Sequence, residues 1–116
     1  MKTTAKHFKI FRNEVIRLYE ALGLKDYSLE IEIADLSENT NARLKYDAPA
    51  KSALIQIASD RRPEYMTDME IKKSAKHEIA HLLTADLSHL AICRFLNDGE
   101  VDMACEAIAR RLEKIL

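Results

Sequence analysis

The sequence predicts a single α+β domain, in which an N-terminal helix precedes a three-stranded, mostly antiparallel sheet, a second helix and a C-terminal helix. Hydrophobic residues recur at helical spacing near the N-terminus and over the last part of the chain, whereas residues 28–58 show the patterns of strands. With 116 residues, the chain has the size of one ordinary domain and is too short to form two independent hydrophobic cores. We therefore expect residues 1–116 to fold as one domain.

The first expected element is an amphipathic helix that ends before Gly23. Its hydrophobic residues recur three or four positions apart, and the glycine follows where such a helix would stop. A stripe of this kind packs a surface helix against a core. The stripe consists of Phe8, Phe11, Val15, Leu18, Tyr19 and Leu22.

Two strands with one polar face are expected next. Hydrophobic and acidic residues alternate over residues 28–36, and hydrophobic and basic residues alternate over residues 42–46. Because turn-forming residues lie between the two segments, we expect them to form a hairpin. In this hairpin, Glu30 or Glu32 would lie opposite Arg43 or Lys45.

A third strand, over residues 53–58, should be the most buried, because its hydrophobic side chains fall on both faces. Further along the chain, Thr67 lies three residues before Glu70, which is the spacing of a capping box at the start of a helix. A loop at residues 97–100 then leads into the last helix. The apolar stripes of these two helices are Ile71, Ala75, Ile79 and Leu82, and then Val101, Ala104, Cys105, Ile108, Leu112 and Ile115.

Composition and charge exclude several classes of protein. Hydrophobic residues make up 47% of the chain and charged residues 32%, which suits a globular domain rather than a disordered one. The 18 basic and 19 acidic residues give a net charge of -1, so we expect no direct nucleic-acid binding. No apolar run approaches the roughly 20 residues that span a membrane, and residues 1–7 lack the apolar core of a signal peptide. We expect a cytoplasmic protein without a membrane partner.

Two histidines four residues apart lie in the helix that follows Thr67. This spacing places His77 and His81 on the same side of a helix, one turn apart, so that both can bind one zinc ion at about 2.0 to 2.1 Å. Glu78 directly follows the first histidine and would lie beside the metal, where a carboxylate can take a proton from a metal-bound water. The sequence therefore predicts one zinc ion per chain, with Glu78 as the general base.

The position of Glu78 on its helix supports this interpretation. At about 100° per residue, Glu78 falls within the apolar stripe that contains Ala75 and Leu82. A buried carboxylate is unfavourable unless a hydrogen bond or a charge compensates it. A metal-bound water supplies such a partner, and a purely structural zinc site does not need a general base.

The sequence His77-Glu78-Ile79-Ala80-His81, together with the order of the elements around it, resembles the zincin metallopeptidases. More narrowly, the chain looks like the minimal gluzincin-type peptidases of phages and other mobile elements, which have relatives among SprT-like and ImmA/IrrE-like proteins. The resemblance covers nearly the whole chain. It implies that the last strand before the motif helix, here residues 53–58, forms the rim of the substrate cleft, and that a glutamate of the following helix completes the zinc site.

Among the acids of the last helix, Glu106 best matches the ligand glutamate of the resembling group. Glu100 lies three residues after Asn97, so the cap of the helix already explains it, and Asp102 is a further alternative. His89 would lie about 12 Å beyond His81 on a continuous helix, and it qualifies only if the helix breaks near residues 86–88. The metzincin pattern is excluded, because it requires a glycine and a histidine at the positions that Thr84 and Leu87 occupy.

The expected function is that of a zinc metallopeptidase in which His77, His81 and Glu106 hold the metal and Glu78 moves the proton. Its partner would be a protein or peptide substrate. The sequence indicates neither the identity of this substrate nor the oligomeric state of the protein. Tyr46 and Tyr65 are candidates for stabilising the oxyanion, although packing explains either of them. The alternative is a zinc-binding or protein-interaction module without catalytic activity.

Overall fold

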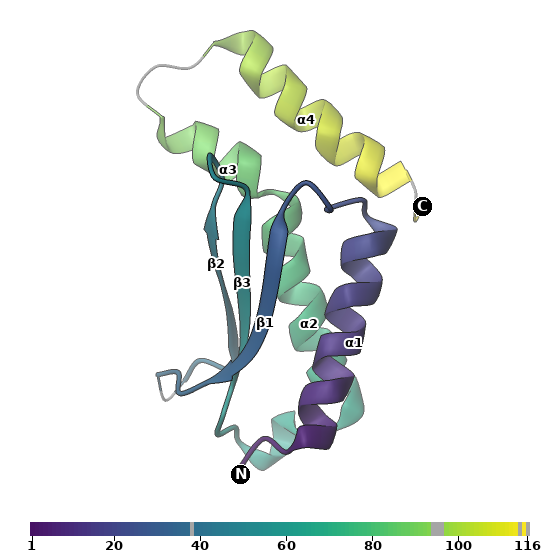
Figure 1. Cartoon of the computed structure of the whole chain (residues 1–116), viewed down its shortest axis with the longest axis vertical. Helices are drawn as coiled ribbons and strands as arrows, with labels where there is room; N and C mark the ends of the chain where they lie inside the picture. The colour runs from purple at the N-terminus through teal and green to yellow at the C-terminus, as the bar shows by residue number, and fades with distance from the viewer. Residues whose placement is uncertain (38, 94–96, 114, 116) are drawn as a thin grey trace.

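A three-stranded sheet with two helices packed on one face forms the centre of the molecule (Figure 1). The structure is a computed structural model, and it describes residues 1–37, 39–93, 97–113 and 115. The predicted α+β class and the terminal helices are confirmed. In chain order the elements are α1 (Ala5–Ala21), β1 (Ser28–Ala34), β2 (Ala42–Asp47), β3 (Ser52–Ala58), the 3-10 helix η1 (Pro63–Tyr65), α2 (Asp68–Leu83), α3 (Ala85–Ile92) and α4 (Asp98–Glu113).

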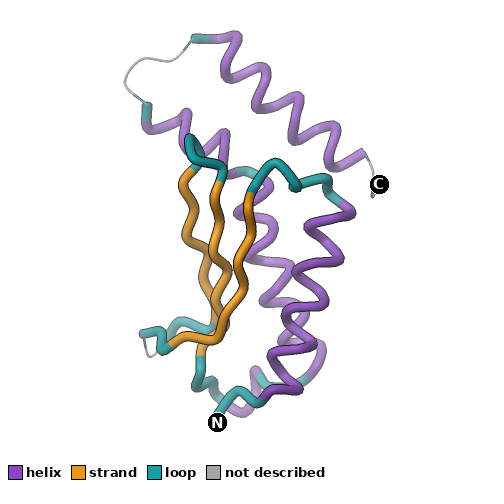
Figure 2. Tube along the Cα trace, in the orientation of Figure 1, coloured by secondary structure: helices purple, strands orange, loops and turns teal. Residues whose placement is uncertain are grey.

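The sheet is mixed, and its strand order is β1-β3-β2. The predicted hairpin between residues 28–36 and 42–46 is wrong, because β3 lies between the two strands, parallel to β1 and antiparallel to β2. The chain leaves β1, passes the position of β3 and returns along the far edge. Figure 2 shows the connection between β1 and β2 at the end of the sheet where the N-terminus lies.

The burial of β3 explains this order. Ala53, Ile55 and Ile57 face the helices and are at most 6% exposed, while Gln56 on the opposite face is also buried. A strand whose two faces are both buried is best placed between two others, because its backbone groups are then also paired on both sides. The predicted burial of residues 53–58 is therefore confirmed, and the edge positions go to β1 and β2 with their charged outer faces.

The helices α1 and α2 provide the other half of the core. Phe11 and Val15 of α1 are fully buried, as are Ile71 and Leu82 of α2, in agreement with the two predicted stripes. The Thr67 hydroxyl accepts a hydrogen bond from the Glu70 N–H at 3.2 Å, which confirms the predicted start of α2. Among the described residues, no helix is both long and apolar enough to cross a membrane.

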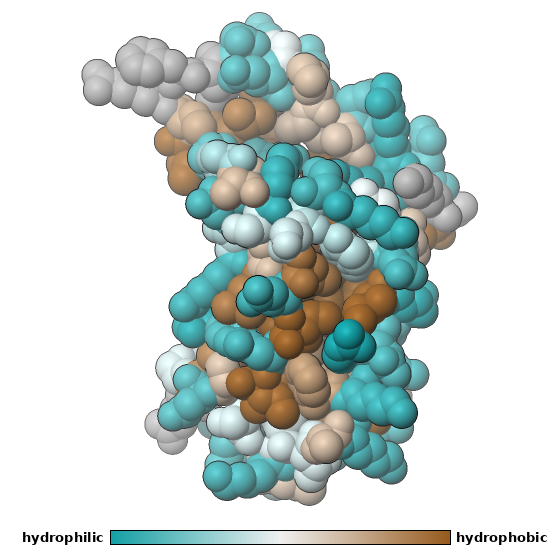
Figure 3. Space-filling model, in the orientation of Figure 1, coloured by the Kyte–Doolittle hydropathy of each residue, from teal (hydrophilic) through white to brown (hydrophobic). Residues whose placement is uncertain are grey.

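The open edge of β1 faces a groove beside α1. Its volume is about 510 Å³, and charged side chains flank its hydrophobic floor. Figure 3 shows hydrophobic side chains gathered in the middle of this face of the molecule. The groove is lined by Arg12, Ile16, Tyr19, Glu20, Leu29, Glu30, Ile31 and Glu32.

The motif helix ends one residue after the last position of its predicted apolar stripe. α2 stops at Leu83, Thr84 leaves the helical conformation, and α3 begins at Ala85. α3 and α4 lie at the end of the molecule opposite the N-terminus (Figure 1). The break therefore places His89 on a separate helix from His77 and His81.

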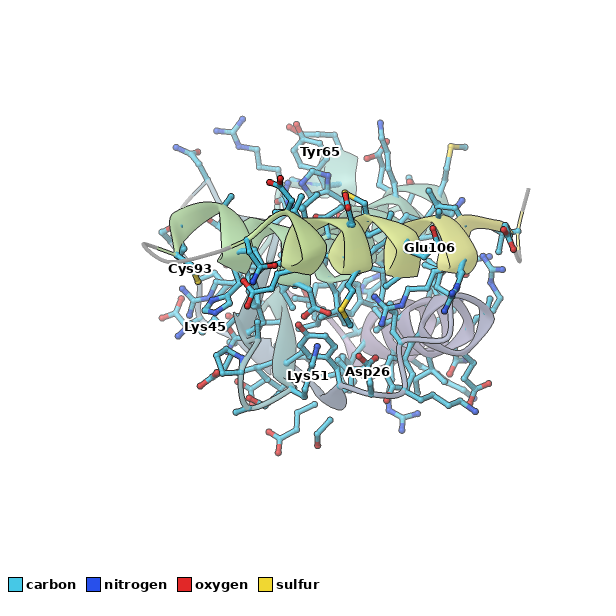
Figure 4. The ribbon with its side chains drawn as sticks, turned by 90° about the horizontal axis from the view of Figure 1, so that it is seen from above. Asp26, Lys45, Lys51, Tyr65, Cys93 and Glu106 are labelled. Carbon is cyan, nitrogen blue, oxygen red and sulfur yellow. The ribbon has the colours of Figure 1, made fainter. Side chains whose placement is uncertain are left out.

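A network of charged residues ties this end of the molecule together. Lys51, in the turn between β2 and β3, lies 2.8 Å from the Asp86 carboxylate at the start of α3 and 3.7 Å from Asp26. Arg111 of α4 binds Asp26 at 3.1 Å, and the Tyr27 hydroxyl donates a hydrogen bond to Asp86. Figure 4 shows Lys51 and Asp26 next to each other beneath α4. The network joins four segments that are far apart in sequence.

We expect Asp86→Asn to lower the stability of the protein by about 1 to 2 kcal/mol, because Lys51 loses its closest carboxylate. Burial raises the pKa of Asp86, but the hydrogen bonds from Lys51 and Tyr27 outweigh it, so the pKa lies below its usual value of 3.8. The stabilisation is therefore complete above pH 3.8 and is lost as the pH falls through the lower, folded-state value. Thermal unfolding at pH 7 and pH 3 measures both effects. Asp35→Asn, which removes no hydrogen bond or ion pair among the described residues, is the control.

Candidate metal centre

The two histidines of α2 present their Nε2 atoms to one point at the surface. His77 and His81 are both exposed, and their Nε2 atoms are 3.1 Å apart. The ring centroids are 4.7 Å apart and the ring planes cross at 87°. Two nitrogens bound at 2.0 to 2.1 Å to one tetrahedral ion lie about 3.3 Å apart. The histidine pair therefore fits a zinc ion with little adjustment.

Glu78 lies next to the pair and is buried, as its place in the apolar stripe predicts. Its side chain is 6% exposed, and burial raises its pKa above the usual 4.5. His77, His81 and a hydrogen bond from the backbone N–H of Leu44 act in the opposite direction. A buried carboxylate that lines an open cleft is suited to accept a proton and return it.

The contact with Leu44 places Glu78 at an open edge of the sheet. Asn41 accepts a hydrogen bond from the Ala58 N–H at 2.9 Å, which makes the pair Ala42 and Ile57 a non-hydrogen-bonded one. Backbone groups of alternate residues then point to opposite sides of β2. Those of Arg43, Lys45 and Asp47 pair with β3, and those of Ala42, Leu44 and Tyr46 face outward.

The strand at the rim of the site is consequently β2 and not the predicted segment 53–58. β3 has a neighbour on both sides, so its backbone cannot bind a substrate. The resemblance placed the rim on the last strand in sequence, whereas the sheet order places that strand in the centre. The outward-facing N–H and C=O groups of β2 can pair with an extended peptide that lies beside Glu78.

A cleft of about 420 Å³ adjoins the motif on the side of the N-terminal half of α2. Its walls come from the connection between β1 and β2, from η1 and from α2, and Tyr65 lies in one of them. His77 and Glu78 line its end, so a ligand in the cleft would lie directly against the motif. The other lining residues are Asn39, Thr40, Asn41, Ala42, Glu70, Lys73 and Ser74.

A buried arginine that the sequence analysis did not identify holds these walls together. Arg61 is 3% exposed and donates hydrogen bonds to the backbone oxygens of Asn41 and Tyr65 and to the Ser74 hydroxyl. Its Nε has no hydrogen-bond partner among the described residues. The sequence gives little signal for this role, because Arg61 stands in a charged loop where an exposed side chain is the usual outcome.

The acids predicted as third ligand are not gathered at the histidine pair. Glu106 is 62% exposed and forms an ion pair with Arg110 on the same helix at 3.4 Å (Figure 4). The Glu100 N–H donates a hydrogen bond to the Asn97 side chain at 2.9 Å, and the Glu100 carboxylate accepts one from the Asn97 N–H. The predicted role of Glu100 in the helix cap is therefore confirmed.

The two remaining alternatives also lie elsewhere. Asp102 is exposed on α4, and His89 is 3.6 Å from the Cys93 sulfur on α3. Within residues 1–37, 39–93, 97–113 and 115, no three side chains of the metal-binding types form a cluster. The described site thus offers His77 and His81 as metal ligands, with Glu78 beside them.

Comparisons with known proteins add no further constraint. No family model, curated protein or solved structure matches the chain significantly. The functional assignment therefore rests on the chemistry of the site.

The two tyrosines weighed as oxyanion donors occupy different positions. Tyr65 lines the cleft beside His77 and Glu78, whereas Tyr46 lies on the open edge strand and is 40% exposed. Of the two, Tyr65 therefore lines the cleft that reaches the motif.

We expect Glu78→Gln to stabilise the metal-free protein by about 1 kcal/mol at neutral pH, because glutamine keeps the shape and the acceptor for the Leu44 N–H without the buried charge. The pKa of Glu78 is raised in the folded state, so the ionised form destabilises the fold above that pKa. The difference between the two proteins should therefore shrink as the pH falls towards 4.5. Thermal unfolding in the presence of a chelator measures it. Glu70→Gln in the same cleft is the control, and an equal gain there would contradict the explanation.

Proposed function

We propose that the protein is a zinc-dependent metallopeptidase that binds one zinc ion per chain and acts on an extended segment of a protein or peptide. The observation that carries the proposal is the combination of two converging histidine nitrogens with a buried carboxylate beside an edge strand of the sheet. A structural zinc site has no need of Glu78, and a simple interaction surface has no need of the histidine pair.

The roles of the residues follow from their positions. His77 and His81 would hold the metal, and Glu106 remains the proposed third ligand because of the resemblance to gluzincins. Zinc held there would supply Lewis acidity, which would make a water more acidic and polarise a carbonyl group. Glu78 orients the attacking water, accepts its proton and returns the proton to the leaving amine, so that one carboxylate acts as base and then as acid.

The edge of β2 supplies the second requirement of a peptidase, which is to hold the substrate in an extended form. The Leu44 N–H is near enough to lower the pKa of Glu78, so a peptide along β2 would have its reacting carbonyl near the level of that residue. The backbone groups of Ala42 and Tyr46 on either side can bind the flanking parts of the peptide. The proposed location is the cytoplasm, with no direct nucleic-acid partner.

We expect the purified protein to contain about one zinc ion per chain, His81→Ala to contain much less, and Glu78→Gln to keep its zinc while losing hydrolysis. Glutamine can accept a hydrogen bond but cannot serve as a base near neutral pH. Metal analysis and comparison of newly formed protein termini by mass spectrometry, after co-expression with a host proteome, measure the two properties. Cleavage by both proteins would remove Glu78 from the mechanism. Bound zinc without any cleavage would favour a non-catalytic zinc module.

We expect Glu106→Gln to weaken zinc binding at least about tenfold, while Glu100→Gln leaves it nearly unchanged. If Glu106 binds the metal, it gives up only an exposed ion pair with Arg110. Glu100, in contrast, is already engaged in the cap of α4. Competition with a chromophoric chelator gives both dissociation constants. If neither change matters, the metal is held by His77 and His81 without an acid from α4.

A further inference from the structure

The open edge strand carries two basic side chains without a carboxylate partner among the described residues. Arg43 and Lys45 project from the outer face of the sheet on either side of Leu44. The Arg43 Nε donates to the Gln56 side chain at 2.7 Å, and neither cation forms an ion pair within 4.0 Å in the part of the chain that the structure describes. Figure 4 shows Lys45 at the rim of the molecule.

The acidic residues of β1 are too far away to neutralise these cations, and Asp47, the acid of β2 itself, accepts a hydrogen bond from the Ala50 N–H at 3.1 Å and forms no ion pair with Lys45 among the described residues. Glu32 and Arg43 belong to the same cross-strand row, but Gln56 lies between them and donates to Glu32 at 2.6 Å. Glu30 is separated from Lys45 by Leu54 in the same way. Strands two positions apart are about 10 Å apart, so the charges of Arg43 and Lys45 remain available on the open side.

The register of β2 makes these two positions the most sensitive to an added strand. Arg43 and Lys45 form hydrogen-bonded pairs with β3, so they form non-hydrogen-bonded pairs with any antiparallel strand on the other side. In such pairs the facing side chains are closest, and opposite charges stabilise the pairing. The residue between them would face Leu44 and the side of the sheet that α2 covers.

We propose that the edge of β2 selects extended peptide segments in which two acidic side chains, separated by one residue, lie opposite Arg43 and Lys45. This inference rests on the proposed function, because it identifies the bound segment with the substrate. Charge complementarity is the reason for the choice of occupant, since no described acid competes for either cation. The intervening residue would carry the carbonyl that lies near Glu78.

The test uses fluorescein-labelled nine-residue peptides with threonine at every second position and glutamate, glutamine or lysine at the others. Fluorescence anisotropy with zinc-supplemented Glu78→Gln protein measures binding without cleavage. We expect the glutamate peptide to bind roughly tenfold more tightly than the lysine peptide, as two favourable cross-strand pairs imply. In Lys45→Glu the preference should weaken, and in the double variant Arg43→Glu and Lys45→Glu it should reverse.

Two controls distinguish pairing along β2 from nonspecific attraction between opposite charges. The double variant Lys9→Glu and Lys25→Glu changes the net charge by the same amount away from the edge and should keep the preference for glutamate. Two further peptides carry methyl groups on every second backbone nitrogen, one on the odd positions and the other on the even positions. One of them should fail to bind and the other should bind normally, because only every second N–H of the peptide points towards β2. Equal affinity for the three peptides, or equal effects of the two double variants, would overturn the proposal.

The same peptides distinguish failure of the peptidase proposal from failure of the proposed preference for acidic segments. Charge-selective binding together with intact peptides after incubation with the wild-type protein would support the docking preference and reject the peptidase. Cleavage without preference for the glutamate peptide would retain the peptidase and overturn this inference. Self-association that Lys45→Glu abolishes would show that β1 of a second copy, with its Glu30-Ile31-Glu32 sequence, occupies the edge, and it would also overturn the inference.

Discussion

The burial of β3, which exceeds that of β1 and β2, is the constraint from which the arrangement of the site follows. Since this strand has to occupy the centre, β2 becomes an edge, and α2 packs beneath it with Glu78 reaching the backbone of Leu44. A hairpin of the first two strands would have enclosed one of the outward-facing backbone rows. The position of Glu78 beside outward-facing strand groups is therefore a result of sheet order, and not of the motif alone.

Much of this could be predicted from the sequence, because local periodicity reports local burial. The stripes of α1 and α2, the cap at Thr67 and the burial of Glu78 all follow from spacing along a helix. Strand order depends instead on contacts between distant segments, and alternation in β1 and β2 describes an edge strand as well as a hairpin. The break at Thr84 and the contacts of Arg61 depend on tertiary packing in the same way.

The candidate site was predictable to a similar extent. His77 and His81 converge because a helix requires it, whereas the position of an acid on α4 depends on how that helix docks. Its docking relies on few contacts, since Ala104 is the only residue of α4 that is buried in the described part of the chain. Glu106 therefore faces solvent here, and the resemblance alone keeps it among the ligands.

The charged network around Lys51 also fixes the motif helix along its own axis. Asp86 follows His81 by five residues, across a single non-helical position, and its carboxylate is bound by Lys51 from the turn between β2 and β3 and by Tyr27 from the loop after α1. A shift of α2 along its own axis would break the contacts of Asp86 with Lys51 and Tyr27. Lys51 itself adopts the left-handed backbone region, with φ 54°, which residues other than glycine adopt only rarely. The turn between β2 and β3 is thus joined through Asp86 to the chain that directly follows the motif helix.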